Sequence, residues 1–163
     1  MSEVPVLTPQ AVLVGGSAGA LEALPELVAR LPPALAVPVV IVLHLARGRA
    51  SLLPEVVAGW TSHPVREPED HDPLAPATIY VAPAGYHLLV DRGPVFTLSA
   101  DAPVNHSIPS IDVLFQSAAE LFGPRALGLL LSGASADGAA GVRAIHDAGG
   151  RVMIQDRAEA RCP

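Results

Sequence analysis

Residues 11–31 read AVLVGGSAGALEALPELVARL, and this stretch decides the fold. Its first five residues, Ala11 to Gly15, form an apolar run that ends in glycine and predicts a buried strand. Leu21 to Leu31 predict a helix, because the apolar residues there recur on one helical face. A buried strand, a glycine-rich turn and an amphipathic helix together form the repeating unit of a parallel α/β sheet.

The same alternation continues along the chain. Further apolar strands are predicted at Val37–Leu43, Ile79–Ala82, Ala126–Leu131 and Val152–Gln155. Further helices are predicted at Ser51–Gly59, Ser110–Phe122 and Asp137–Ala148, with Ser51 as a cap of the first. His87–Asp91 and Val95–Leu98 flank a turn and predict a β-hairpin, and Glu67–Pro76 predicts a surface loop. The pattern predicts a doubly wound, mostly parallel α/β sheet with helices on both faces, a three-layer sandwich with a hairpin insertion.

Composition limits the classes of function. The 163 residues predict one domain, and 50% hydrophobic with 16% charged residues exclude disorder as the main state. The net charge is −6, and the ten basic residues are scattered arginines. This arrangement argues against a nucleic-acid partner or an anionic lipid surface.

The ends of the chain bear on its compartment. Cys162 is the single cysteine, so no internal disulfide can form, and Met1–Gln10 lack the basic run of a signal peptide. No apolar stretch is long enough to span a bilayer, so we expect a cytoplasmic protein without direct membrane insertion. The chain stops just after its last predicted strand, so a covering C-terminal helix is expected to be missing.

Three polar residues follow three of the predicted strands. Ser17 follows the first strand, His44 follows the second, and Asp137 lies a few residues past Leu131. Ligands of open parallel sheets bind at the carboxyl ends of the strands. A serine, a histidine and an aspartate at that edge are the residue types of a nucleophile, its general base and the acid that orients the base.

The turn around Ser17 reads Gly15-x-Ser17-x-Gly19, whose small residues permit a tight strand-to-helix turn that exposes the hydroxyl. The backbone N–H of Ala18 is the natural first donor to an oxyanion at the start of the next helix. A dinucleotide-binding turn needs different glycine spacing and an acidic residue where His44 stands. A phosphate-binding glycine loop stays open as an alternative.

Each of these residues also has a structural interpretation. His44 is compatible with a hydrogen-bonded core histidine, and Asp137 with an N-cap of the helix that follows it. Asn105 and His106 are candidates for a substrate groove, although the segment that ends at Ser110 also fits a turn and a helix cap. His87 is a further candidate for a cleft. No pair of histidines has metal-ligand spacing, so neither a metal nor a cofactor is predicted.

The chain resembles the catalytic domain of the chemotaxis protein-glutamate methylesterases (CheB-type). The likeness runs from about Val12 to Gln155. The segments that carry it are Val14-Gly15-Gly16-Ser17-Ala18-Gly19, Leu43-His44-Leu45, Ile79-Tyr80-Val81-Ala82-Pro83, Pro103-Val104-Asn105-His106, Pro109-Ser110-Ile111-Asp112-Val113-Leu114-Phe115 and Leu131-Ser132-Gly133-Ala134-Ser135-Ala136-Asp137-Gly138-Ala139.

This resemblance implies a doubly wound domain that hydrolyses γ-glutamyl methyl esters on methylated chemoreceptors or receptor-like helical proteins, releasing methanol without a cofactor. Some members also deamidate receptor glutamines. By position, Ser17 would be the nucleophile, His44 the general base and Asp137 the residue that orients it. We expect a single catalytic domain over residues 1–163 without the family's receiver domain.

The chain departs from the family at Ala134, where a methionine usually contributes to the wall of the site, so a roomier site is expected. Two rival functions remain. One is a non-catalytic regulatory or binding relative of the methylesterases, and the other is an esterase or amidase that acts on small molecules.

Overall fold

The computed structural model describes residues 7–17, 19–44, 51–132 and 136–156. Its centre is a six-stranded parallel sheet, which confirms the predicted doubly wound, mostly parallel fold class. The strand order is β3-β4-β2-β1-β7-β8. The strands are β1 (Ala11–Gly16), β2 (Val39–Leu43), β3 (Val65–Arg66), β4 (Ile79–Val81), β7 (Ala126–Leu130) and β8 (Arg151–Ile154).

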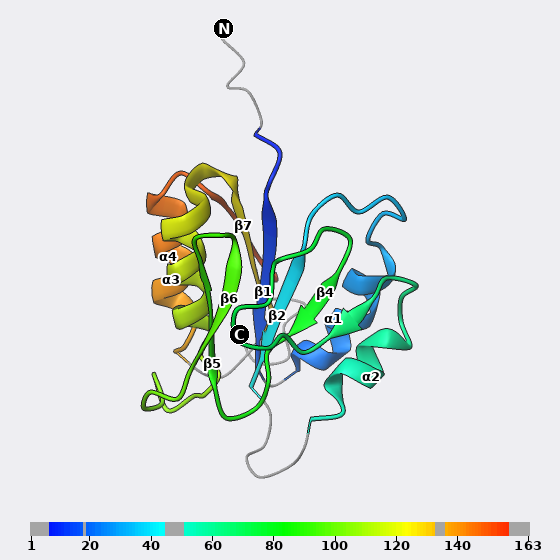
Figure 1. The fold of residues 1–163 in the computed structure, drawn as a ribbon, viewed down its shortest axis with the longest axis horizontal. Coiled ribbons are helices and arrows are strands. Elements are labelled where there is room, and N and C mark those ends of the chain that lie inside the picture. Colours follow the sequence, from blue (N-terminus) through cyan, green and yellow to red (C-terminus); the bar gives the residue numbers. More distant parts are fainter. Residues whose placement is uncertain (1–6, 18, 45–50, 133–135, 157–163) are drawn as a thin grey trace, which may run out of the picture.

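Helices cover both faces of this sheet (Figure 1). They are α1 (Ala20–Ala29), α2 (Leu53–Ala58), α3 (Ile111–Phe122) and α4 (Ala139–Asp147), with the 3₁₀ turn η1 (Gly123–Arg125) before β7. One apolar core joins α1 and α2 to side chains of β1, β2 and β4. A second core joins α3, α4 and the hairpin to the opposite face. The alternating side chains of the uniformly apolar strands β1 and β2 therefore fill two separate cores, which is why these two strands are buried on both faces.

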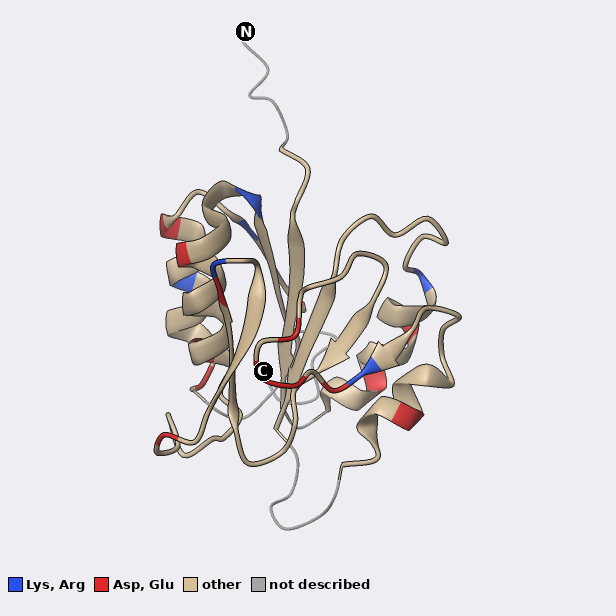
Figure 2. Cartoon of the chain, in the orientation of Figure 1, with Lys and Arg blue, Asp and Glu red and all other residues tan. Residues whose placement is uncertain are grey.

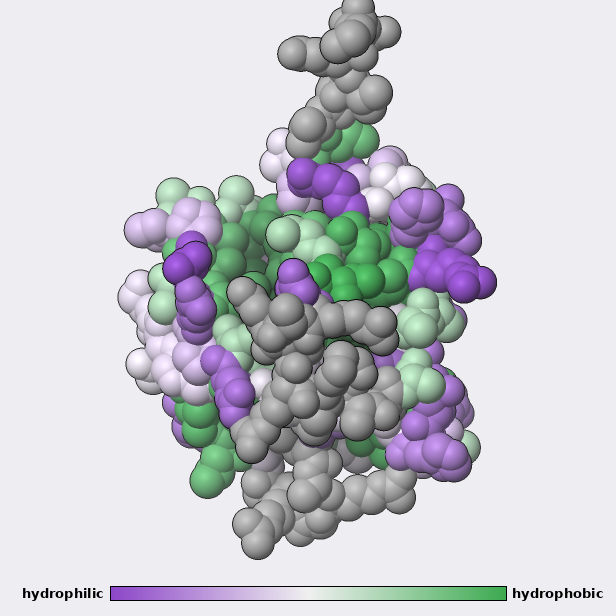
Figure 3. All heavy atoms as spheres, turned by 180° about the vertical axis from the view of Figure 1, so that it is seen from behind, coloured by the Kyte–Doolittle hydropathy of each residue, from purple (hydrophilic) through white to green (hydrophobic). Residues whose placement is uncertain are grey.

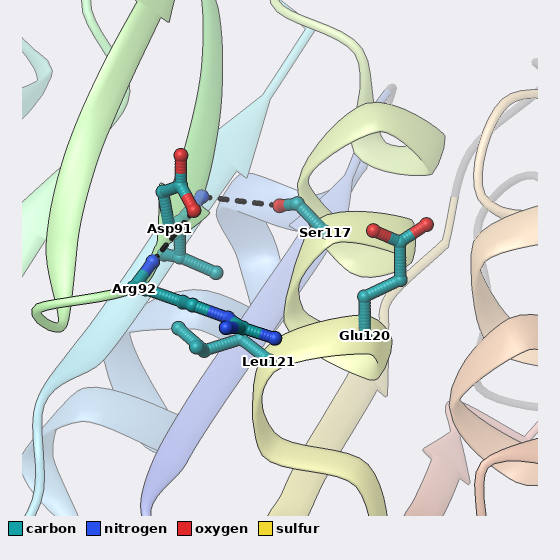
Figure 4. A pocket seen from close by; sticks show the side chains of 6 residues that line it. Asp91, Arg92, Ser117, Glu120 and Leu121 are labelled. Atoms are coloured by element: carbon teal, nitrogen blue, oxygen red, sulfur yellow. Dashed lines mark hydrogen bonds between the residues drawn. The ribbon is translucent and has the colours of Figure 1, made fainter.

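The predicted hairpin, β5 (His87–Asp91) and β6 (Val95–Ser99), forms a separate antiparallel pair. It packs on α3, where the backbone N–H of Val90 donates a 3.1 Å hydrogen bond to Ser117 Oγ (Figure 4). A cavity of about 230 Å³ lies at this junction and is lined by Val90, Asp91, Arg92, Ser117, Glu120 and Leu121. Its lining includes none of the three strand-end residues.

The switch point of the sheet lies at β1. This strand pairs with β2 on one side and with β7 on the other, so the chain builds outward in one direction and later returns to build in the other. The chain that leaves β1 enters α1 on one face of the sheet, and the chain that leaves β7 enters α4 on the other face. Ligands of open parallel sheets bind outside the carboxyl ends of the strands at such a switch point. Ser17, His44 and Asp137 all follow strands that end at this place.

The predicted elements agree with the structure to within about two residues, apart from the short strand β3, which the sequence analysis missed. One interpretation is wrong. The helix expected from Asp137 begins at Ala139, and its N-cap is Gly138, which makes no side-chain capping bond. Asp137 therefore does not cap the helix that follows it.

The arginines of the described chain are distributed over several helices, strands and turns rather than along one element (Figure 2). Edge strand β8 exposes Met153 and Ile154, each at 63%. Seen from behind, apolar side chains gather in the upper half of the described surface (Figure 3). Within the described ranges, no helix has the length and apolar character needed to cross a membrane.

Candidate active site

Ser17 and His44 lie side by side because β1 and β2 are in parallel register. Gly16 pairs with Leu43, and the backbone N–H of His44 donates a 3.0 Å hydrogen bond to the carbonyl of Gly16. The pairing therefore continues one residue past the end of β2. Neighbouring strands are about 4.8 Å apart, so the backbones of Ser17 and His44 are adjacent at the edge of the sheet.

The turn that carries Ser17 is fixed on two sides. Its N–H donates to the carbonyl of Ser132, beyond β7, at 3.2 Å, and its own carbonyl accepts from the N–H of Ala20 at 3.1 Å. Gly19 then enters α1 with a left-handed φ of 81°. Glycine adopts that conformation without strain, so the chain can turn sharply from strand to helix.

His44 and Asp137 form a hydrogen-bonded pair. The distance from His44 Nε2 to Asp137 Oδ2 is 2.8 Å. The His44 side chain is 13% exposed, whereas the Asp137 side chain is fully buried. Because a carboxylate can only accept, Nε2 carries the proton in this pair and Nδ1 of the neutral ring is left as the acceptor. Nδ1 is therefore the ring nitrogen that is available to act as a base, while Nε2 is held by Asp137.

The Asp137 carboxylate accepts several further hydrogen bonds. Oδ2 also accepts from the N–H of Ile111 at 2.6 Å, and Oδ1 accepts from Ser110 Oγ at 2.7 Å and the N–H of Asp112 at 3.0 Å. Burial raises the pKa of Asp137, but the bonds from His44, Ser110 and the two backbone groups outweigh it and lower the pKa to about 2. Asp137 is therefore an anion at neutral pH.

These bonds place Asp137 at the N-terminus of α3, the helix that precedes it in sequence. The free N–H groups and positive dipole end of a helix stabilise a carboxylate at this point. Ser110 caps the same helix, as the sequence predicted, since its Oγ accepts from the N–H of Val113. Asp137 is thus a helix cap in addition to the partner of His44, but of a different helix from the one expected.

Asn105 and His106, the groove candidates, form the centre of a two-residue turn. Both are exposed and have left-handed φ values of 51° and 64°, a conformation that asparagine tolerates well. Asn105 Nδ2 donates to Asp112 Oδ2 at 2.9 Å and lies 3.4 Å from Asp137 Oδ1. Asn105 therefore bridges two carboxylates, a role that the sequence analysis missed. Whether either residue contacts substrate stays a prediction.

His87 does not line a cleft, contrary to expectation, because it is only 2% exposed. Its Nε2 lies 2.9 Å from the carbonyl of Ala102, and its Nδ1 accepts from the N–H of Ser110 at 3.2 Å. His87 therefore holds both ends of the segment that contains Asn105 in place.

Parts of the predicted site fall on residues that the structure does not describe. Ala18 and Ala134, the predicted oxyanion donor and wall residue, lie outside the described residues. Among the described residues, no hydrogen bond joins Ser17 Oγ to His44, as is common before substrate binds. No group of three or more metal-ligating side chains occurs in the described part of the chain either.

Chemically, a serine hydroxyl beside an imidazole that is backed by a buried carboxylate can open an acyl bond. The imidazole would take the hydroxyl proton, and the carboxylate would stabilise the imidazolium that forms.

The comparisons with known proteins all lead to one family of proteins. Residues 12–163 match the family model described as CheB methylesterase. A putative protein-glutamate methylesterase/protein-glutamine glutaminase of Leptospira interrogans is 34% identical over 147 residues, covering 90% of this chain and 76% of the relative. Protein-glutamate methylesterase/protein-glutamine glutaminase 1 of Carboxydothermus hydrogenoformans is 40% identical over 152 residues, but the match spans only 45% of that protein. The crystal structure of the Thermotoga maritima CheB methylesterase catalytic domain superposes with a TM-score of 0.88 at 26% identity, covering 96% of this chain and 84% of that one.

Proposed function

This chain belongs to the CheB methylesterase family, and we propose that it hydrolyses γ-glutamyl methyl esters on a methylated chemoreceptor or receptor-like helical protein. The observation that carries the proposal is the 2.8 Å bond between His44 and buried Asp137, beside Ser17 at the switch point of the sheet. The names of the relatives support this substrate class and also deamidation of glutamine side chains.

In the proposed reaction, Ser17 Oγ attacks the ester carbonyl while His44 Nδ1 takes the hydroxyl proton. The tetrahedral intermediate collapses, and methanol leaves with the proton that His44 returns. Water then attacks the acyl-enzyme with His44 again as base, which releases the glutamate carboxylate and restores Ser17. For a glutamine substrate the leaving group is ammonia, and the steps are otherwise the same.

Asp137 has an electrostatic role in both steps. Because its pKa is about 2, it keeps its negative charge while His44 cycles between imidazole and imidazolium. A buried, fully hydrogen-bonded carboxylate stabilises the imidazolium more than a solvated one would, and it holds the ring in the tautomer that leaves Nδ1 free. We propose the backbone N–H of the residue after Ser17, near the N-terminus of α1, as the first oxyanion donor.

The test is methanol release from a fully methylated receptor fragment, with a small methyl ester as a second substrate. Release from the receptor fragment that exceeds release from the small ester, and that is lost in Ser17→Ala, supports the proposal. Preference for the small ester would indicate a small-molecule esterase. Binding of the receptor fragment without methanol release would indicate a non-catalytic relative.

A further inference from the structure

Asp112 is a buried carboxylate that the proposed mechanism does not use. It lies in the first turn of α3 and is 4% exposed. No arginine of the described chain forms an ion pair with it. Its charge is instead satisfied by three N–H donors: Oδ1 accepts from Gly138 at 2.9 Å and Gly141 at 2.7 Å, and Oδ2 accepts from Asn105 Nδ2 at 2.9 Å.

Asp112 thus caps α4, and Asp137 caps α3. Asp112 lies in the first turn of α3, the helix that Asp137 caps, and Asp137 lies two residues before α4, the helix that Asp112 caps. The N-termini of the two helices are therefore tied together by reciprocal hydrogen bonds. The two helices pack closely enough for this, since a Cβ on Gly141 would lie 2.6 Å from the Cβ of Phe115. A shift of either helix would therefore move both carboxylates.

The contacts of Asp112 converge on Asp137 from three directions. The backbone N–H of Asp112 donates to Asp137 Oδ1 at 3.0 Å. Its Oδ1 holds the N–H of Gly138, the residue next to Asp137 in the chain. Its Oδ2 orients the Asn105 amide, whose nitrogen lies 3.4 Å from Asp137 Oδ1.

We propose that Asp112 is a positioning residue, which together with Asn105 holds Asp137, and through it the His44 imidazole, in the orientation that the reaction needs. This inference rests on the proposed function. Asp112 touches neither His44 nor a reacting atom, so it acts only through Asp137.

The donor count explains why an acid is required at this position. An asparagine at 112 has one oxygen and one NH₂ group. If its oxygen faces the N–H groups of Gly138 and Gly141, its NH₂ group faces the NH₂ group of Asn105. Two hydrogen-bond donors would then face each other. Asn105 must then flip its amide so that its oxygen faces residue 112. The oxygen would take the place of Nδ2, which now lies 3.4 Å from Asp137 Oδ1, and would repel that carboxylate instead of donating to it. Asp112→Asn therefore removes a donor from Asp137 without removing much volume.

The experiment compares Asp112→Asn with Asp101→Asn in the full chain. Asp101→Asn makes the same change of charge at a position outside the site. Asp101 is exposed, lies in the loop between β6 and α3, and accepts a hydrogen bond from Ser99 Oγ. Three readouts are taken: kcat and KM for methyl ester hydrolysis, the proton NMR resonance of His44 Nε2–H, and the melting temperature. The resonance is assigned by its loss in His44→Gln.

We expect Asp112→Asn to lower kcat by about 10- to 100-fold, with KM within about twofold of the parent, because a small misplacement of catalytic groups has effects of this size. The His44 resonance should shift or broaden, and Asp101→Asn should match the parent in all three readouts. A folded Asp112→Asn protein with the parent's kcat and an unchanged resonance would overturn the proposal, even if it melts lower.

A second variant keeps the test decisive if Asp112→Asn does not fold. Asn105→Gly removes the bridging amide, while glycine accepts the φ of 51° at this position. It should lower kcat and perturb the His44 resonance in the same direction, and an unchanged resonance would refute the positioning role. If the parent releases no methanol, the proposed function fails, and the resonance alone still decides whether Asp112 and Asn105 position the pair.

Discussion

Replacement of Asp137 by asparagine should cost both activity and stability. Each oxygen of Asp137 accepts at least two hydrogen bonds: Oδ2 from His44 and Ile111, and Oδ1 from Ser110 and Asp112. Whichever oxygen becomes an NH₂ group, it will face two donors in a buried site. If Asp137 were only a helix cap, asparagine could replace it with little loss of stability or activity. This variant therefore distinguishes a cap from a charged partner of His44.

The structure sets the expected magnitude. The pKa of Asp137 falls from 3.8 to about 2, although burial opposes the change, which corresponds to about 2 kcal/mol of preference for the anion in the folded protein. We expect Asp137→Asn to lose about 2 kcal/mol of folding free energy at neutral pH, or more where the buried donors stay unpaired. Its rate of ester hydrolysis should fall roughly 10²- to 10⁴-fold, because asparagine cannot stabilise the imidazolium.

The loss of stability in Asp137→Asn should depend on pH. Since the pKa is lower in the folded than in the unfolded state, the contribution of Asp137 is fully present above the unfolded value of 3.8 and is lost as pH falls toward 2. The free energies of unfolding of parent and variant, measured by urea titration, should therefore differ most at pH 5 to 7, approach each other as pH falls below 3.8, and converge only near or below about pH 2. Asp101→Asn serves as the exposed control and should follow the parent.

Two results would refute this reasoning. A difference in unfolding free energy that is the same at pH 6 and at pH 2.5 would show that the charge of Asp137 is not what stabilises the fold. A rate within about threefold of the parent would remove Asp137 from the mechanism and leave it as a cap of α3.

Three further predictions follow from the site. Ser17→Ala should abolish ester hydrolysis while the melting temperature stays near that of the parent, because one half-buried oxygen is lost; an active variant would contradict the nucleophile assignment. His44→Gln should lower the rate of ester hydrolysis to near that of Ser17→Ala, because glutamine cannot take the hydroxyl proton, and a variant that keeps the parent's rate would argue against His44 as base. Gly15→Ala should lower both the melting temperature and kcat, because its Cβ would collide with Ile111, whose N–H holds Asp137, and unchanged values in both assays would show that Ile111 can yield.

The sequence was sufficient to predict the fold and the meeting of the three strand-end residues. Uniformly apolar strands that alternate with amphipathic helices imply a parallel sheet, and parallel strands end at one edge. The positions of Ser17 and His44 at that edge depend only on where β1 and β2 end, which periodicity and glycine placement reveal to within about two residues. Asp137 follows β7 after a loop, so its approach to the same edge was expected from the order of the elements alone.

The sequence was not sufficient to predict how Asp137 is held. Its capping of α3 depends on the approach of two helices that begin 28 residues apart in sequence, at Ile111 and Ala139, and local patterns report only nearby partners. The bridging role of Asn105 and the burial of His87 depend on the same tertiary approach. The one local signal was Asp112, an acidic residue in the first turn of an apolar helix, but it equally fits an ordinary interaction with the dipole of its own helix.

The central claim is that Ser17 is a nucleophile activated by His44, and labelling by a fluorophosphonate probe tests it most directly. The account predicts a covalent phosphonyl adduct on Ser17, located by mass spectrometry of the digested protein, with no adduct in Ser17→Ala and much slower labelling in His44→Gln. Methanol release from methylated receptor in a protein whose Ser17 stays unlabelled, or labelling at the same rate without His44, would contradict the account.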